Sequence, residues 1–229
     1  MARTDVATRP AQGVTNVEKN FFEQYGEQAS QRSSIVGSLL KFSKGDWLLG
    51  QDEEEVESGT KYVVSMENFL VGWVKWVDNK PVEQQMGRLI DGHKPPARSA
   101  LGDMDQETWE TGPDGKLRDP WQFSNQVLMK PVAKKYALDN AITFVTSSKG
   151  GIGALGDLCK KYGAEMRTHD GKNPIVEIGT DAYAHPNKEY GRIKIPTFTL
   201  TGWESKSLFD IDAANAEDAD EAKPKGKKK

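Results

Sequence analysis

The segment "TFVTSSKGGIGALGDLCKKYG", residues 143–163, decides the fold because it passes directly from a strand into a helix. Thr143 to Thr146 favour a strand, Ser and Gly residues follow, and the next stretch predicts a helix over about 152–162. Strand, glycine-rich loop and helix is also the layout in which nucleotide-binding proteins hold a phosphate at a helix N-terminus. The segment therefore predicts a phosphate site or a plain strand-to-helix connection.

Nucleotide chemistry is disfavoured by the residues that follow the glycines. The stretch KGGIGAL resembles a P-loop, but Ala154 and Leu155 stand where that loop needs a Lys and a Ser or Thr. Gly151, Gly153 and Gly156 give a lone G-x-G-x-x-G late in a β-rich chain, which is the wrong place for a dinucleotide-binding unit. We therefore expect neither nucleotide hydrolysis nor dinucleotide binding.

Two interpretations of the segment remain open. In the structural one, Ser147 or Ser148 caps the helix, two glycines make the turn, and small residues let the helix pack closely on the sheet. In the functional one, exposed backbone N–H groups and Lys149 bind a phosphate of a polynucleotide. The glycines and small residues of the structural interpretation are Gly150, Gly151, Gly153, Ala154 and Gly156.

The rest of the chain is rich in strand signals, so we expect a mainly β (α+β) domain. Strands are predicted before the helix at 44–50, 60–66, 121–132 and 136–148, with a hairpin at about 70–90 that turns at DNKP, and after it at 174–185 and 191–203. Residues 91–120 are dense in Pro, Gly and Asp and are predicted to form a loop. Several strands, one helix and two more strands is the order of an OB-like barrel, although another small barrel or sandwich fits nearly as well.

Composition sets the class of protein. No apolar run is long enough to span a membrane, and no signal-peptide core follows the N-terminus. The single cysteine, Cys159, excludes an internal disulfide, and the three scattered histidines give no metal-binding spacing. We therefore expect a cytoplasmic protein without cofactor or metal.

The two ends of the chain differ from its middle. Residues 1–34 are polar and predict a flexible segment, in which a short helix over 16–28 can form. Residues 205–229 hold an acidic block and then a basic one, which predicts a disordered tail. The domain is therefore expected over 35–204. Its residues 123–203 carry an excess of Lys and Arg over Asp and Glu, in a chain of net charge -3.

Aromatic and basic residues near the strands suggest a surface for single-stranded nucleic acid. Proteins of this kind stack bases on aromatic faces and hold phosphates with Lys and Arg. Most of the six tryptophans are expected in the core, with Trp76 the most exposed. Arg192 and Lys194 alternate along one strand and are expected to share a face. The candidate nucleic-acid-binding residues are Lys61, Tyr62, Lys75, Trp76, Arg88, Lys149, Tyr183, Tyr190, Arg192 and Lys194.

An enzyme is not indicated. The acidic stretch 103–110 fails the EF-hand spacing, because Thr108 and Asp114 stand at the positions that need Gly and Glu. It is predicted to be a solvated loop, and whether it binds a metal stays open. Cys159 is expected to be a small buried residue. The three histidines assemble no catalytic arrangement.

Strings such as KGDWLLG, GWVKWVDNKPVEQQMGRLIDGHKPPARSALGDMDQETWE and FVTSSKGG resemble a family of uncharacterised bacteriophage and prophage proteins over about residues 41–203. The resemblance implies a phage origin and the cytoplasm of a bacterial host, and no activity. The tail is similar to the acidic C-terminal tails of single-stranded DNA-binding proteins, although it ends in KPKGKKK. That similarity implies a partner-binding segment with Phe209, Asp210 and Asp212.

The leading hypothesis is a non-enzymatic phage protein that binds single-stranded DNA and supports replication or recombination. Its expected partners are single-stranded DNA, replication or recombination proteins through the tail, and further copies of the chain, but not a membrane. The alternatives are a phage structural or assembly protein, in which the Trp-rich strands form subunit contacts, and a host-interaction protein.

Overall fold

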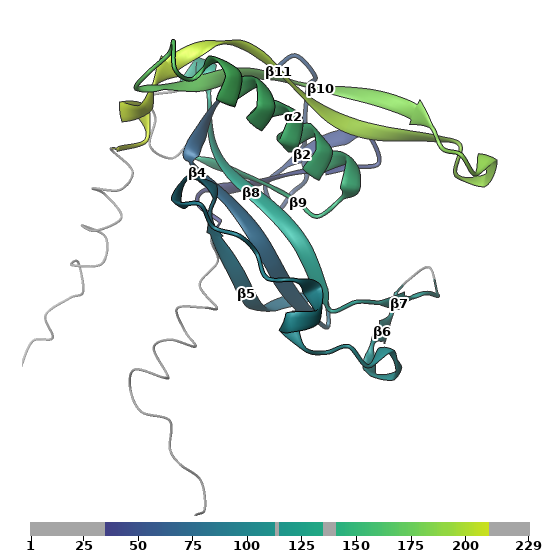
Figure 1. The fold of residues 1–229 in the computed structure, drawn as a ribbon. Coiled ribbons are helices and arrows are strands. Elements are labelled where there is room, and N and C mark those ends of the chain that lie inside the picture. Colours follow the sequence, from purple (N-terminus) through teal and green to yellow (C-terminus); the bar gives the residue numbers. More distant parts are fainter. Residues whose placement is uncertain (1–34, 113–114, 135–140, 211–229) are drawn as a thin grey trace, which may run out of the picture. The chain divides into compact units, whose positions relative to one another are not determined.

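A computed structural model of the protein describes residues 35–112, 115–134 and 141–210 (Figure 1). They form a mainly β structure in which a curled sheet makes half a barrel and one α-helix packs against it. The helix expected over 16–28, and Asp212 of the tail, lie outside the described residues. In the described part of the chain, no helix has the length and apolar character needed to cross a membrane.

The strands agree in large part with the predicted positions. The first five are β1 (Ser38–Ser43), β2 (Asp46–Leu49), β3 (Glu54–Val56), β4 (Lys61–Val77) and β5 (Lys80–Arg88), and the others are β6 (Glu110–Thr111), β7 (Leu117–Arg118), β8 (Trp121–Pro131), β9 (Ile142–Thr146), β10 (Lys172–Ala184) and β11 (Arg192–Ser205). Helix α2 spans Lys149–Glu165, and the 3-10 turns are η1 (Leu89–Asp91), η2 (Arg98–Leu101), η3 (Gln106–Thr108), η4 (Val132–Lys134), η6 (Lys188–Tyr190) and η7 (Lys206–Leu208).

The long strand β4 is the centre of the sheet. The order is β11-β10-β4-β8-β9-β1-β2-β3, and β5 pairs with the second half of β4 on the side where β10 pairs with its first half. The turn between β4 and β5 places Asp78 and Asn79 at φ 50° and 58°, as a two-residue hairpin loop requires. β1 and β9 pair in parallel, which joins the N-terminal hairpin to the strand before α2.

The curl of the sheet encloses an aromatic core. Trp47 on β2 lies against Phe144 and Phe198, with ring centroids 5.3 and 5.6 Å away, and its Nε1–H donates to the Gly179 carbonyl at 3.1 Å. The core is therefore closed between β2 near one end of the sheet and the β10–β11 pair at the other. Leu155 and Leu158 of α2 are fully buried against it.

The cap of helix α2 is one that the structural interpretation predicts, but the helix begins at Lys149, earlier than predicted, so Gly150 and Gly151 lie in its first turn and make no turn before it. The Ser148 hydroxyl accepts the N–H of Gly151 at 3.0 Å and caps the helix. A Cβ on Gly151 would lie 2.1 Å from Thr146 Oγ1, so only glycine allows this close approach. The prediction that Gly153 and Gly156 pack on the sheet is wrong, because a Cβ on either would meet nothing within 4 Å.

The domain extends past the predicted boundary at 204. β11 ends at Ser205, the turn η7 follows, and Phe209 is buried in a second cluster with Val63 and Leu208. The buried Lys130 ammonium donates to the Leu208 carbonyl at 3.0 Å and lies 5.6 Å from the Phe209 ring centre. Phe209 is therefore a core residue here, and not the exposed anchor of a tail. Asp210, at the end of the described residues, is exposed.

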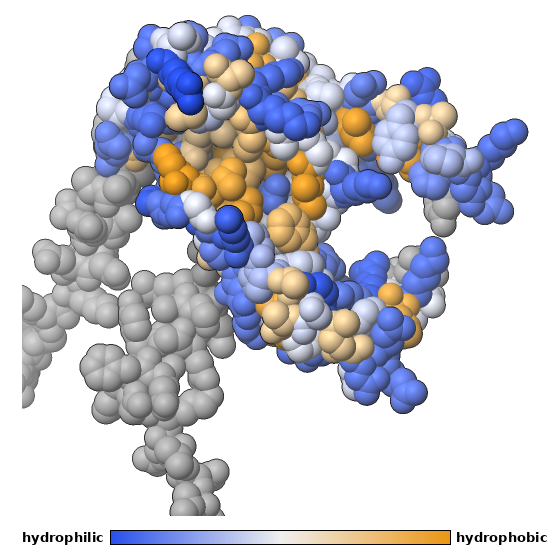
Figure 2. Space-filling view, viewed as in Figure 1, coloured by the Kyte–Doolittle hydropathy of each residue, from blue (hydrophilic) through white to orange (hydrophobic). Residues whose placement is uncertain are grey.

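Hydrophobic and hydrophilic residues occupy different regions of the surface. Figure 2 shows hydrophobic residues gathered in the middle of one face, beside α2, while the extended β10–β11 hairpin and the region of β6 and β7 are mostly hydrophilic. Both hydrophilic projections lie on the side where α2 begins (Figure 1).

Candidate functional site: two hollows beside the start of α2

Several predicted binding residues lie apart from one another or are engaged elsewhere. Tyr62 is 2% exposed, and burial raises its pKa to about 12, so the prediction that it stacks on a base is wrong. The Arg88 guanidinium donates two hydrogen bonds to Asp91, at 2.8 and 2.9 Å. The Lys61 ammonium lies 3.8 Å from the Glu177 carboxylate. The side chain of Tyr190 is not among those that the structure describes.

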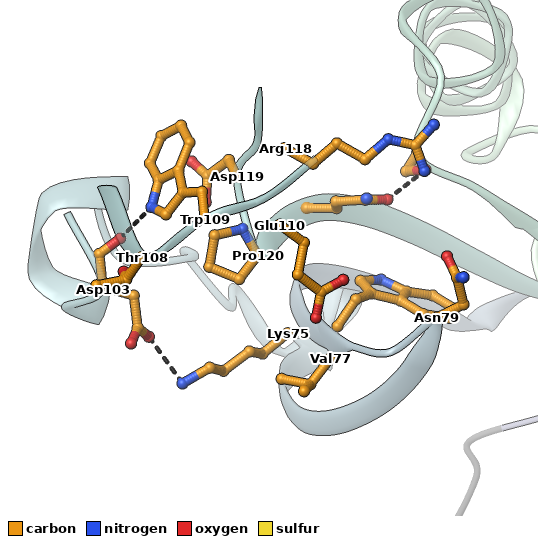
Figure 3. A pocket seen from close by; sticks show the side chains of 13 residues that line it. Lys75, Val77, Asn79, Asp103, Thr108, Trp109, Glu110, Arg118, Asp119 and Pro120 are labelled. Atoms are coloured by element: carbon orange, nitrogen blue, oxygen red, sulfur yellow. Dashed lines mark hydrogen bonds and ion pairs between the residues drawn. The ribbon is translucent and has the colours of Figure 1, made fainter. Parts of the chain in front are cut away.

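Lys75 and Trp76 lie together at the end of β4, in a pocket of about 590 Å³ that we call the tryptophan pocket. A register shift in the β4–β5 pairing falls between these two residues, and the Trp76 N–H donates to the Pro120 carbonyl at 2.8 Å. Figure 3 shows the wall formed by the loop before β8 and by β6 and β7. The residues that line the pocket are Lys75, Trp76, Val77, Asn79, Asp103, Thr108, Trp109, Glu110, Arg118, Asp119, Pro120, Gln122 and Ser147.

The wall of this pocket is fixed by a hydrogen-bond network around Asp103. The Asp103 carboxylate accepts from the Lys75 ammonium and from Trp121 Nε1–H, both at 2.9 Å. These two hydrogen bonds hold the pKa of Asp103 below its usual value. The Asp103 carbonyl accepts from Trp109 Nε1–H at 2.9 Å, which fixes that ring. The acidic stretch 103–110 is thus an ordered wall.

Lys149 and Tyr183 lie in a second hollow, of about 790 Å³, that we call the helix groove. It runs between the face of α2 from Lys149 to Lys161 and the β10–β11 hairpin. Two aromatic residues line the groove, Tyr183, which is 46% exposed, and Phe198, which is buried. The lining residues are Lys149, Gly150, Gly153, Ala154, Asp157, Lys161, Asp181, Tyr183, Ile195, Pro196, Thr197, Phe198 and Thr199.

Arg192 and Lys194 do not join this groove. Asp181 pairs with Ile195 and Tyr183 with Ile193, so these residues share the groove face of the hairpin. Lys194 pairs with Ala182 and Arg192 with Ala184, which places both cations on the opposite face. The sequence correctly predicts that the two cations share a face, and the structure separates that face from Lys149.

The two hollows meet at the start of α2. Ser147 lines the tryptophan pocket, Ser148 caps the helix, and Lys149 lines the helix groove. The Ser147 hydroxyl also lies 3.4 Å from Gln122 Oε1 in the pocket. Three consecutive residues therefore connect a pocket with two tryptophans to a groove with a tyrosine.

Every carboxylate that lines the two hollows is engaged by a donor. Three form ion pairs: Lys75–Asp103 at 2.9 Å, Arg98–Asp119 at 2.7 Å and Lys160–Asp157 at 3.0 Å. The other two accept backbone N–H groups, Glu110 from Asp78 at 2.9 Å and Asp181 from Ala182 at 2.7 Å. Three of the five lining carboxylates are therefore paired with a cation of the protein, and the other two accept from neutral N–H groups.

Three lining cations lack such a partner. Arg118, Lys149 and Lys161 form no ion pair with any carboxylate of the described residues, and all three are exposed. The first turn of α2 also contains no acidic residue to balance the positive end of the helix dipole, and Lys149 adds a further positive charge there. The surface that joins the pocket to the groove can therefore accept anions.

The described residues offer no metal centre. Among them no three His, Cys, Asp or Glu residues lie close enough together to hold an ion. Cys159 is half-buried on α2, and burial raises the pKa of its thiol, which makes it a poor nucleophile.

Sequence reasoning missed Trp109, Arg118 and Lys161 as site residues. Lys161 follows Asp157 by four residues on α2, and no local pattern shows that it also lines the helix groove. Trp109 and Arg118 stand in a segment predicted to be a loop, and no local pattern shows that this segment folds against β4.

No family model matches the sequence, and the chain has no significant similarity to curated proteins or to solved structures. Its function is therefore inferred from the geometry of the two hollows.

Proposed function

We propose that the protein binds single-stranded DNA, without catalysis, along a path from the tryptophan pocket across the start of α2 into the helix groove. The observation that carries this proposal is the distribution of charge in the lining. Arg118, Lys149 and Lys161 are free of carboxylate partners, while the lining carboxylates are already engaged. Cations arranged in this way attract a chain of phosphates.

The aromatic residues favour single-stranded DNA over duplex DNA as the ligand. Trp76 and Trp109 line the pocket at one end of the path, and Tyr183 lines the groove at the other. Bases can stack on such rings only when they are not paired with a second strand. An OB-like barrel, which the order of strands and helix suggests, would support the same mode of binding. A role in phage DNA replication or recombination follows as part of the proposal.

The first test is fluorescence anisotropy of labelled oligo-dT with the full chain over a series of salt concentrations. We expect binding at about 50 mM salt that weakens as salt increases, because bound counterions are released from the phosphates. A triple variant, Arg118→Ala, Lys149→Ala and Lys161→Ala, should lower the slope of log K against log salt by about 2, at roughly 0.7 per lost phosphate contact.

The matched control removes the same charge elsewhere, through Lys41→Ala, Arg88→Ala and Lys172→Ala. Lys41 and Arg88 are already held by Glu53 and Asp91, and Lys172 begins β10 at the end away from the groove. For this control variant, the slope of log K against log salt in oligo-dT binding should be nearly unchanged. No binding by the wild-type chain at about 50 mM salt, or equal slopes for the two triple variants, would overturn the proposal.

A further inference from the structure

We propose that the tryptophan pocket binds one guanine base of the strand, an inference that rests on the proposed function. The pocket combines two half-buried tryptophans with a carboxylate, an amide and a guanidinium, from Glu110, Gln122 and Arg118. Its volume of about 590 Å³ is within the range of sites for small organic ligands. Aromatic walls with a few polar groups that converge on them are typical of such sites.

Hydrogen bonds hold part of the pocket wall in place before any ligand arrives. Asp103 connects two of its parts, since its carboxylate accepts from Lys75 and its carbonyl accepts from the Trp109 ring. Arg98 donates to both carboxylate oxygens of Asp119 at 2.7 Å, and also to the Gly102 carbonyl at 2.6 Å. A ring held in place in this way loses little entropy when a base stacks on it.

Glu110 decides which base fits. Its Oε1 accepts the Asp78 N–H at 2.9 Å, which orients the carboxylate and leaves Oε2 free to accept. A carboxylate offers only acceptors, so it matches an edge with two adjacent N–H donors. Guanine has this edge at N1–H and N2–H. Adenine and cytosine place an acceptor beside their amino group, and thymine flanks its single N–H with two carbonyls.

Arg118 lies on the β6–β7 side of the same pocket, as does Trp109 (Figure 3). It can hold the phosphate attached to the bound nucleotide with its planar set of donors. Gln122 accepts from Ser147 through Oε1, at 3.4 Å, which leaves its amide N–H₂ as a donor toward a base carbonyl. The polar groups of the pocket thus complement a guanine nucleotide at the base and at the phosphate.

The test compares oligo-dT with oligonucleotides in which one central thymine is replaced by guanine, adenine or cytosine. The guanine-containing strand should bind ~10-fold more tightly than the others, the discrimination expected of a two-bond base contact. Glu110→Gln keeps the acceptor for the Asp78 N–H but replaces the free oxygen with a donor, so it should abolish the preference while oligo-dT still binds. Glu107→Gln, in the same loop but outside the pocket, is the control. This variant should keep the preference for guanine.

Equal affinity for all four oligonucleotides, or a guanine preference that survives Glu110→Gln, would overturn this inference and leave the proposed function intact. If oligo-dT does not bind at all, the proposed function fails. The pocket is then tested by titration with dGMP and the other three mononucleotides, followed by tryptophan fluorescence. Selective quenching by dGMP would support the pocket, and the absence of selective quenching would overturn it.

Discussion

The Lys75 ammonium lies 2.9 Å from the Asp103 carboxylate, and this ion pair fastens the segment between η2 and β6 to the end of β4. Trp121 Nε1–H donates to the same carboxylate, and Trp109 Nε1–H donates to the Asp103 carbonyl. Lys75 therefore shapes the tryptophan pocket, and its charge is already balanced. Its role differs from the phosphate contact that the sequence predicts for it.

Asp103→Asn should loosen this wall while the rest of the domain stays folded. Asn keeps the side-chain size and tolerates the positive φ of 52° at this position, but removes the charge that Lys75 needs. We expect a loss of about 1 kcal/mol in urea denaturation, with faster limited proteolysis at sites between 98 and 120. Asp52→Asn, in an exposed turn, is the control. Identical proteolysis patterns for both variants would contradict this role.

The same carboxylate should make part of the stability depend on acid pH. The pKa of Asp103 is lowered in the folded state by Lys75 and Trp121, so its contribution is complete above the unfolded value of about 3.9. It is lost as pH falls through the lower folded value. The stability difference between wild type and Asp103→Asn should therefore stay constant from about pH 5 to 7 and shrink below about pH 4. A difference that does not change with pH would show that the ion pair contributes nothing.

Tyr62 should give the opposite dependence at alkaline pH. Burial raises its folded-state pKa from 10.0 to about 12, so the unfolded chain ionises first and stability falls as pH rises between these values. Between about pH 9 and pH 11.5 the loss should be about 2 kcal/mol. Tyr62→Phe should remove that part of the decline, as measured by urea denaturation at each pH. The prediction is wrong if both proteins lose stability equally.

The end of the domain can be located by two truncations. A chain that ends at Asp210 keeps η7 and the contact of Phe209 with Lys130, and should be as stable as the full chain. A chain that ends at Glu204 loses Leu208 and Phe209 from the second cluster and should lose about 3 kcal/mol or more. Equal unfolding midpoints for the two truncations would show that Phe209 contributes no stability. Experiments on the tail's effect on DNA binding should therefore use the longer form.

Much of the fold could be predicted from local pattern. The hairpin turn at Asp78 and Asn79 and the cap at Ser148 follow from turn and capping chemistry, and the strands β10 and β11 follow from β-favouring residues and alternation. The parallel pairing of β1 with β9 could not be predicted, because their residues lie about 100 positions apart and neither strand specifies its neighbour. The strongly charged residues that follow Phe209 predict a tail position for it, although its side chain is buried.

The site was harder to predict, because exposure depends on tertiary contacts. Tyr62 and Trp76 each follow a Lys in a predicted strand, but Tyr62 lies in the core and Trp76 lines a pocket. Lys149 was predicted as a phosphate contact from its place before the helix, and the structure puts it in the groove. Arg118 could not be predicted, since its role depends on how the loop from 91 to 120 folds back on β4.

The most direct test of the central proposal compares Lys161→Ala with Lys172→Ala in oligo-dT binding over a salt series. Both variants lose one positive charge, but only Lys161 lines the helix groove. We predict that Lys161→Ala weakens binding and lowers the slope of log K against log salt by about 0.7, while Lys172→Ala leaves the slope unchanged. Equal slopes for the two variants would contradict a DNA path through the helix groove.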